Sequence, residues 1–503
     1  MSNSILIISF GGKYSHLIAK RIRKLGVYCL VVPHTVSIDH IKNFKPNGII
    51  LTDDPNDVCV NNAKTFDTEI FNLNVPILGI GYGALFTIKS FDGEVEPNET
   101  AAGCKMEKLV INCNSVLFNN TAKTTICPIN KLYSVLNPPD NFKTTSTVGG
   151  CHTTSFENTS KNVFALQFYP DVEHTGFGTK VISNFVFSVC RCDIDWSPKK
   201  VLENKINDIK RKIGDNMVIC GVSSNVGSVI TAMMLHEVIG DSLTCVFIDH
   251  GFLETGERNY VEKLFKNKLK IKNFTTVDMG ERFLSKLKGI SDLEQKKTII
   301  EREFAFVLEK EAEKSKKIDF LVKCDVLQDN FIDNSQIYFD VDRPQKSKKF
   351  EIIEPLIDLY RSEIKTIGKL LKIPNEILSA TCYSSFGIAT KIVGEITSEK
   401  IDIVRNVDAI LSKELAEYNY HNKVYQFSIT LDDITCANSC NKDVGYTVII
   451  KATLNNASKI KEWIEMIKSI ADTVATRIIN EVNSVNKILL DITPESPAIY
   501  ERK

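Results

Sequence analysis

The sequence predicts an α/β protein that contains two α/β units followed by a small α+β module. Three observations support this prediction. Short apolar runs alternate with amphipathic stretches from residue 4 to residue 91, a second pattern of strand, loop and helix begins at residue 216, and the composition changes near residue 391. Strands and helices that alternate at this spacing are typical of βα units on a parallel sheet.

The first unit opens with four predicted pairs of strand and helix. The strands are the runs "SILIISF", "VYCLVVP", "GIILT" and "VPILGI", and the helices are predicted over residues 14–26, 36–42, 58–72 and 83–91. Shorter strands with polar turns continue to about residue 170, which predicts a β-rich layer at one side of the sheet. A polar, lysine-rich stretch that includes Trp196 then predicts a linker helix.

The run "ILGIGYGALF", residues 77–86, predicts a sharp turn between a strand and a helix. Glycines at alternate positions, Gly79, Gly81 and Gly83, are typical of a nucleophile elbow, where a reactive side chain sits on a strained turn and only small neighbours fit. The position of the nucleophile is Gly81, which has no side chain. The pattern therefore indicates the backbone of a nucleophilic site without its reactive group.

The second unit begins with "NMVICGVSSNVGSVITAMMLHEVIG", a buried strand, a loop of small residues and a helix. Backbone N–H groups of such a loop can bind phosphate at the N-terminus of the helix. Any tight βα turn uses the same residues, so the loop alone is weak support for a nucleotide site. From about residue 391, two β-type runs and the helical run "ATRIINEV" predict the α+β module.

Composition and charge narrow the class of protein. The chain has 503 residues, 43% of them hydrophobic, which is enough for two or three domains. Lys plus Arg equals Asp plus Glu at 62 each, so charge gives no attraction to nucleic acid or to an anionic membrane. The fourteen cysteines form no C-x-x-C pair, which favours reduced thiols over metal ligands. We therefore expect a cytoplasmic protein without a metal site, a nucleic acid partner or a membrane partner.

Several long stretches carry a resemblance to a known family: "VPILGIGYG", "LQFYPDVEHT", "VICGVSSNVGSV" and "KIVGEITSEKIDIVRNVDAI". Over nearly its whole length the chain resembles the two-activity GMP synthetases, which hydrolyse glutamine in one domain and use the ammonia and ATP to aminate xanthosine monophosphate (XMP). The resemblance implies a class I glutamine amidotransferase-like domain of flavodoxin-like fold over residues 1–195. It further implies an ATP pyrophosphatase-like domain, similar to the adenine nucleotide alpha-hydrolases, over residues 196–390 and a C-terminal dimerisation module over residues 391–503.

The resemblance places altered residues at each component of glutamine hydrolysis. The family elbow reads G-x-C-x-G with a nucleophilic cysteine, and Gly81 stands in that position here. The family's base and its orienting acid come from Q-F-H-P-E, which is "QFYPD" here and supplies Tyr169 and Asp171; a tyrosine, with an ordinary pKa of about 10, is a poor base near neutral pH. The oxyanion-hole glycines correspond to Asp53 and Asp54, carboxylates where negative charge would develop. We expect no glutaminase activity.

The resemblance also marks an altered nucleotide site. The family loop S-G-G-V-D-S, whose aspartate lies by the metal and the phosphates, reads S-S-N-V-G-S over residues 223–228, so that Gly227 replaces the aspartate. ATP with Mg²⁺ is expected only if this loop still binds phosphate. His250, which follows the next predicted strand, is expected to be exposed. The residues implied to bind the nucleotide are Gly221, Ser223, Val226, Ser228 and Asp249.

Positions implied to bind the substrate nucleotide differ further. A Q-G-T segment of the family corresponds to residues 323–325, which read K-C-D, and a phosphate-binding lysine of the family corresponds to Glu495. The residues implied to remain in this site are Arg302, Lys391 and Glu501, with Lys391 in an arginine position. Arg302 is equally well explained as a structural ion-pair partner.

These substitutions lead to a main hypothesis and to alternatives. The main hypothesis is a pseudoenzyme, not an enzyme, because the substitutions fall on positions of chemistry while the apolar pattern of the core persists. It would act by binding: as a homodimer, as a heterodimer with an active paralogue, or through a purine nucleotide or nucleoside ligand. The alternatives are an ATP-dependent GMP synthase that converts XMP to GMP with ammonia, and a ligase of altered substrate specificity.

Overall fold

The computed structural model divides the chain into two compact units, one formed by described residues up to Val201 and one by described residues from Leu202 onward. The domain limits predicted at residues 195 and 390 stay predictions. The structure describes residues 3–12, 14–52, 64–97, 104–111, 114–130, 133–149, 152–170, 177–315, 318–326, 349–378, 386–417, 424–437, 444–454 and 460–491.

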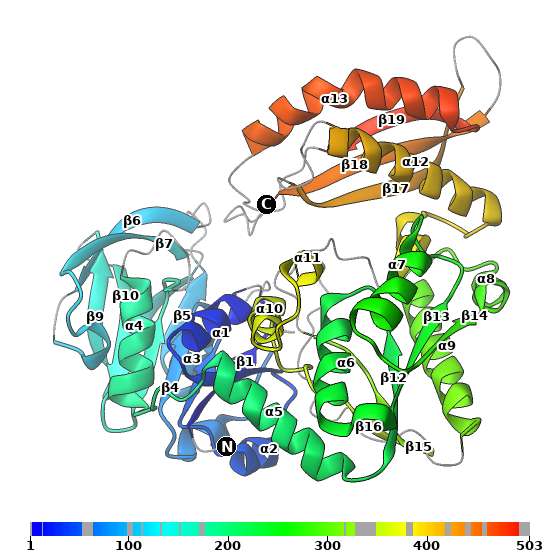
Figure 1. Ribbon diagram of the computed structural model, residues 1–503. Helices are drawn as coiled ribbons and strands as arrows, with labels where there is room; N and C mark the ends of the chain where they lie inside the picture. The colour runs from blue at the N-terminus through cyan, green and yellow to red at the C-terminus, as the bar shows by residue number, and fades with distance from the viewer. Residues whose placement is uncertain are drawn as a thin grey trace. The chain divides into compact units, whose positions relative to one another are not determined.

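A mixed sheet forms the centre of the first unit (Figure 1). Among the described residues it has nine strands in the order β2-β1-β3-β4-β11-β10-β9-β6-β7. The neighbours from β2 to β11 pair in parallel, and those from β11 to β7 pair antiparallel. The predicted βα units and the β-rich layer are therefore both present. The strands are β1 (Ser4–Ser9), β2 (Tyr28–Pro33), β3 (Gly48–Leu51), β4 (Ile77–Ile80), β6 (Cys104–Ile111), β7 (Thr124–Asn130), β9 (Lys143–Val148), β10 (His152–Asn158) and β11 (Val163–Leu166), with β5 (Glu94–Pro97) and β8 (Tyr133–Asn137) forming a separate pair.

Helices cover the parallel part of this sheet. The helix α1 (Ser15–Lys24) packs on β1 and β2, and α3 (Tyr82–Ser90) packs on β4 and β11. The helix predicted over residues 58–72 is described only from residue 64, where a short 3₁₀ turn, η1 (Thr68–Asn72), is found instead. The remaining helical segments are α2 (Ile38–Phe44), η2 (Val116–Phe118), α4 (Gly178–Ser183), the π-helical η3 (Asn184–Val189) and α5 (Pro198–Ile213), the predicted linker helix.

A parallel sheet forms the centre of the second unit, in the order β14-β13-β12-β15-β16. The helix α6 packs on β12 and β13, and α9 packs on β12, β13 and β15, so that this sheet is covered by its own βα units. The strands are β12 (Met217–Val222), β13 (Leu243–Asp249), β14 (Asn273–Asp278), β15 (Ile318–Val322) and β16 (Glu351–Ile353), and the helical segments are α6 (Val226–Ile239), η4 (Gly240–Ser242), α7 (Glu257–Lys263), η5 (Leu264–Lys268), α8 (Gly280–Leu287), α9 (Leu293–Glu313), α10 (Arg361–Leu370), α11 (Asn375–Leu378) and η6 (Gly387–Lys391).

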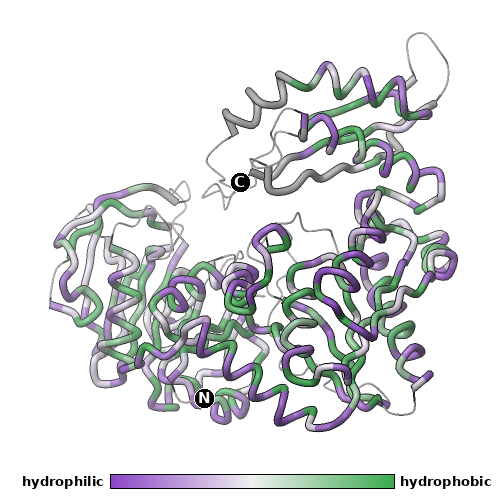
Figure 2. The backbone as a smooth tube through the Cα atoms, viewed as in Figure 1, coloured by the Kyte–Doolittle hydropathy of each residue, from purple (hydrophilic) through white to green (hydrophobic). Residues whose placement is uncertain are grey.

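The C-terminal part of the second unit is the predicted α+β module. Its sheet has the order β17-β18-β19, with β17 antiparallel and β19 parallel to β18. One apolar cluster runs from β12 and β13 through η6 into this module, and Val393 N–H donates to Leu431 C=O across the junction. Figure 2 shows hydrophobic residues along the central strands of the chain and many hydrophilic residues along helices such as α5. The elements are α12 (Ser398–Glu417), β17 (Val424–Ala437), β18 (Val444–Leu454), α13 (Ile460–Glu481) and β19 (Val485–Asp491).

Candidate functional site

The sharp turn predicted between β4 and α3 is present. Gly81 joins the two elements with φ 59° and ψ −117°, a conformation that side chains rarely adopt, and its N–H donates to Leu166 C=O at 2.8 Å. A Cβ atom built on Gly83 would lie 2.2 Å from Leu51 O, and one on Gly79 would lie 2.5 Å from Gly83 O. The strand and the helix therefore approach so closely that both flanking positions require glycine.

The elbow carries no nucleophile, and the described thiols of the first unit do not replace one. Cys190, for example, packs against Gly48 at the start of β3. Because β3 and β4 are parallel, this position is at the opposite end of the strands from the elbow that follows β4. Burial raises the pKa of the Cys190 thiol well above its ordinary value, so that it stays protonated. Beside Gly81, the Tyr82 hydroxyl donates to Lys64 C=O at 2.5 Å. These contacts support the fold of the turn and supply no attacking group.

Tyr169, in the position of the base, is packed as a core side chain. It is only 8% exposed, and its ring lies 5.0 Å from the ring of Tyr14. Arg21 holds the next residue in place by donating to Pro170 C=O at 3.2 Å and to the Thr179 hydroxyl at 2.9 Å. The remaining expected components of this site, Asp53, Asp54 and Asp171, lie outside the described residues.

The loop between β12 and α6 is closed by its own serines. Ser223 N–H donates to Ser228 Oγ at 2.7 Å, and Asn225 N–H donates to Ser223 Oγ at 3.3 Å. The buried Ser224 hydroxyl donates to Glu257 Oε1 at 2.6 Å, and the other oxygen of Glu257 accepts from Glu254 N–H at 3.1 Å. The loop thus has the strand, turn and helix N-terminus of a phosphate-binding loop, with a carboxylate fixed behind it.

The position of the missing aspartate is filled by neighbouring residues. A Cβ atom on Gly227 would lie 2.9 Å from Val326 Cγ1 and 3.2 Å from Cys324 O. A carboxylate at this position would displace Val326 and the backbone before it. Gly227 is therefore closely fitted to its surroundings, and restoring an acidic side chain by this single substitution would require these neighbours to shift.

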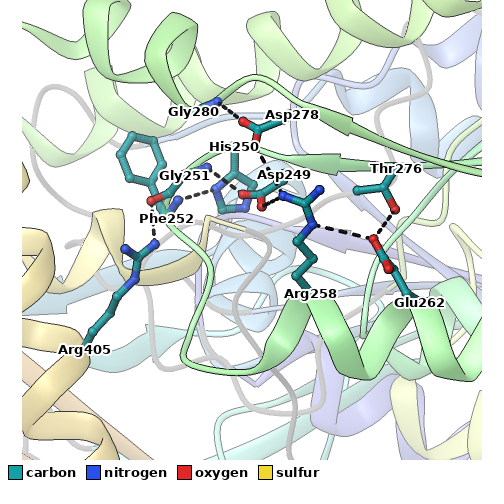
Figure 3. A network of polar contacts seen from close by, with 10 residues as sticks. All are labelled: Asp249, His250, Gly251, Phe252, Arg258, Glu262, Thr276, Asp278, Gly280 and Arg405. Atoms are coloured by element: carbon teal, nitrogen blue, oxygen red, sulfur yellow. Dashed lines mark hydrogen bonds and ion pairs between the residues drawn. The ribbon is translucent and has the colours of Figure 1, made fainter.

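Asp249 lies at the end of β13 in a network of polar contacts (Figure 3). Its Oδ1 accepts from Gly251 N–H at 3.0 Å, and its Oδ2 lies 3.2 Å from a guanidinium nitrogen of Arg258. The same nitrogen reaches Asp278 at 3.2 Å, and Arg258 Nε lies 3.5 Å from Glu262. The negative charge of Asp249, a residue expected to bind a nucleotide, is therefore neutralised by Arg258 of the same chain.

His250 is buried, so the expectation that it is exposed was wrong. Only 3% of its surface is exposed, and its ring lies between 5.3 and 5.9 Å from the rings of Phe252, Phe283 and Phe304. Its Nδ1 accepts from Phe252 N–H at 3.1 Å. Burial, with a smaller effect of the Arg405 charge, lowers the pKa of His250 to about 4. The side chain is therefore a neutral core residue that shapes the turn after β13.

Lys391, expected at the substrate nucleotide, is paired with two carboxylates. Its Nζ lies 2.9 Å from Glu254 Oε1 and 3.4 Å from Asp408 Oδ1, and only 10% of its side chain is exposed. Burial opposes the charge, but the carboxylates of Asp408 and Glu254 outweigh it and raise the pKa of Lys391. These two ion pairs neutralise the positive charge of Lys391, which would otherwise attract a phosphate.

Of the other two residues expected at the substrate nucleotide, only one is described. Arg302 is exposed on α9, and among the described residues its guanidinium has no acidic partner, so the structural explanation of this arginine gains no support. Glu501 lies outside the described residues, as does Glu495. Their expected roles stay predictions.

Sequence reasoning missed Arg405, which lies in one of the stretches that carry the resemblance. From α12 it donates to Gly251 C=O at 2.8 Å and to Leu253 C=O at 3.1 Å (Figure 3). The C-terminal module therefore fixes the turn that follows Asp249. Beside this contact is a cavity of about 160 Å³ lined by Gly251, Phe252, Gly280, Leu284, Ser398, Ile401, Asp402 and Arg405.

The described residues also limit the possibility of a metal site or a membrane span. No group of three or more His, Cys, Asp or Glu side chains in these ranges is arranged to hold a metal ion. None of the helices in the described part of the chain has the length and apolar character needed to cross a bilayer.

Comparison with known proteins now decides the family. The family model "Glutamine amidotransferase class-I" matches residues 6–189, and "GMP synthase C terminal domain" matches residues 413–502. A protein of Clostridium kluyveri named "GMP synthase [glutamine-hydrolyzing]" is 37% identical over 505 residues, which cover 99% of both chains. One of the same name from Clostridium botulinum strain Kyoto is 36% identical with the same coverage.

The chain belongs to the GMP synthase family. This result confirms the resemblance and the α/β class with its amidotransferase-like first part. A crystal structure of a protein from Thermoplasma acidophilum, described as part of a GMP synthase, is 23% identical and covers 38% of this chain and 94% of its own, with a TM-score of 0.33; this overlap adds nothing to the assignment.

Membership in the GMP synthase family bears on the hypotheses drawn from the sequence. The relatives are named for an enzymatic activity over their full length, and this favours the alternative, an ATP-dependent GMP synthase, over the pseudoenzyme. The expectation that the chain is not an enzyme gains no support from them. The altered positions described above are departures from the family pattern that the sequence resemblance implies.

Proposed function

We propose that this chain is an ATP-dependent ligase of the GMP synthase family that takes free ammonia and does not hydrolyse glutamine. The observation that carries the proposal is the altered elbow in a chain that matches the family over nearly its whole length. The chain matches glutamine-hydrolysing GMP synthases over 99% of its length, yet its elbow has a glycine where a nucleophile must stand. Ammonia therefore has to come from solution or from another protein.

The proposed reaction needs no group of the first unit. The purine carbonyl oxygen of XMP attacks the α-phosphate of ATP, and pyrophosphate leaves. Ammonia then forms a C–N bond at the purine carbon, and the adenylated oxygen leaves as AMP with release of a proton. Backbone N–H groups at the N-terminus of α6 would stabilise the phosphates, and Mg²⁺ would enter with ATP through its phosphate oxygens.

The test compares the two nitrogen sources. Purified protein is given ATP, Mg²⁺ and XMP with either ammonium or glutamine, and AMP and GMP are quantified by chromatography. We expect turnover with ammonium and none above background with glutamine. Ser228→Ala, prepared in the same way, removes the acceptor of Ser223 N–H and should lower the ammonium-dependent rate, which excludes a contaminating synthetase. Equal rates with both sources would contradict the proposal.

A non-catalytic role is the second candidate, and two specific contacts favour it. Val326 fills the space beside Gly227, and Glu254 and Asp408 neutralise Lys391. In that case we propose that the chain acts by binding, as a homodimer or with an active paralogue, or through a purine nucleotide or nucleoside. No turnover with either nitrogen source, together with a rise in the thermal midpoint on adding a purine ligand, would support this candidate.

A further inference from the structure

Three thiols lie on or just after neighbouring strands, close to the loop between β12 and α6 of the second unit. Cys220 on β12 is in register with Cys245 on β13 and with Val322 on β15, and Cys324 follows two residues after Val322. The Sγ atoms of Cys220 and Cys324 are 3.6 Å apart. Both cysteines are free in the structure.

We propose that Cys220 and Cys324 are a thiol modification site, a pair that hydrogen peroxide oxidises to a disulfide next to the phosphate loop. A disulfide has an S–S length of about 2.05 Å, so the two sulfur atoms need to approach by roughly 1.5 Å. Cys324 follows the end of β15, outside the strand, and can supply this movement. The proposal does not depend on the proposed function.

Exposure assigns the order of the two steps. Cys220 is completely buried, whereas Cys324 is partly exposed, so the oxidant meets Cys324 first. Its thiolate attacks the peroxide, an S–O bond forms, the O–O bond breaks and hydroxide leaves. The sulfur of Cys220 then attacks the sulfur of Cys324, the S–S bond forms, the S–O bond breaks and water leaves. In sum, two thiols and one peroxide give one disulfide and two waters.

The neighbours of Cys324 connect this site to the loop. Its thiol donates to Gly221 C=O at 3.3 Å, and its own carbonyl oxygen would lie 3.2 Å from a Cβ atom on Gly227. Oxidation removes the S–H donor from Gly221 and ties the segment after β15 to β12. The segment that contains Cys324 and Val326, which packs against Gly227 in the first turn of α6, is then covalently linked to β12.

The test is a map of disulfides after mild oxidation. The full chain is treated with hydrogen peroxide, remaining thiols are alkylated under denaturing conditions, and the protein is cut before aspartates, which separates Cys220 from Cys245 because Asp241 lies between them. We expect a loss of two hydrogens in the intact mass and a linked peptide pair that contains Cys220 and Cys324, reversed by a reductant.

Two matched variants decide between the pairings. Cys245→Ser should form the same linked pair, and Cys324→Ser should form none while keeping the thermal midpoint of the parent. A link from Cys220 to Cys245, links only between chains, or Cys324 oxidised to a sulfinic acid without a link would each overturn the proposal. Absence of any oxidation at these two thiols, while exposed thiols react, would overturn it as well.

Discussion

Gly81 shows at the scale of one residue how this chain departs from the elbow pattern that the sequence resemblance implies. The backbone there is in a region that only glycine enters without strain. The turn is kept although the nucleophilic side chain that such a turn usually presents is absent. The fold of the elbow therefore depends on the close approach of strand and helix. The chemistry depends on a single side chain, and the loss of that side chain does not disturb the fold of the turn.

Gly81→Ala should destabilise the protein by about 1–3 kcal/mol, because alanine must adopt the positive φ of this turn. Urea unfolding followed through signals of the first unit measures the effect. A comparison change, Ala84→Gly, lies in the first turn of α3 and reports the cost of glycine in a helix together with the loss of one buried methyl group, about 2 kcal/mol in sum. An unchanged unfolding midpoint for Gly81→Ala would contradict the assigned backbone conformation.

His250 predicts a dependence of stability on pH. Its pKa is about 4 in the folded chain and about 6.5 when unfolded, so the unfolded state binds more protons between these values and stability falls as the pH is lowered from 6.5 towards 4. Between pH 6.5 and pH 4, this pKa difference lowers the free energy of unfolding by about 3 kcal/mol at most.

His250→Gln keeps a hydrogen-bond acceptor for Phe252 N–H but cannot take up a proton. The free energy of unfolding of this variant should change less between pH 6.5 and pH 4 than that of the parent. His16, whose pKa is lowered by burial to about 3, titrates in both proteins and cancels from the comparison. Parallel pH profiles for the two proteins would show that His250 is accessible to protons in the folded state.

At the scale of elements, the neighbouring strands β12 and β13 of the second unit each end in a sharp turn. The turns that follow these strands are held from other elements: Glu257 on α7 accepts from Ser224, and Arg405 on α12 donates to Gly251 and Leu253. The positions of these two turns therefore depend on hydrogen bonds from residues that are distant in the sequence.

Arg405→Gln should loosen the turn after β13, because two partly buried carbonyl groups lose a charged donor at a cost of about 1–3 kcal/mol. Hydrogen exchange measured by mass spectrometry should become faster in peptides covering residues 249–256. Arg477→Gln is the matched control, since Arg477 pairs with Glu414 and Glu481 within the C-terminal module. Equal exchange in this turn for both variants would show that Arg405 does not hold it.

At the scale of the whole molecule, the two units have separate cores. The cluster of the first unit lies between its sheet and its helices, whereas one cluster in the second unit runs from β12 into α12, β18 and α13. The C-terminal module and the β12–β16 sheet should therefore gain and lose stability together.

Leu411→Ala tests this coupling. Leu411 is 1% exposed in the shared cluster, and its truncation should cost about 2–5 kcal/mol. Hydrogen exchange is expected to accelerate both in β12 and in β18, and to stay unchanged in β1 and β3 of the first unit. Acceleration confined to β18 would show that the module unfolds independently of the parallel sheet.

The sequence by itself determined the alternation of strands and helices at the start of each α/β unit, the glycine turn at residues 79–83 and the missing nucleophile, because periodicity, glycine spacing and residue type are local properties. Only the tertiary structure decided the surroundings of single side chains. It buried His250 among three aromatic rings, paired Lys391 with Glu254 and Asp408, and brought Cys324 to Cys220, because each of these contacts joins segments that lie far apart along the chain or depends on the packing around them.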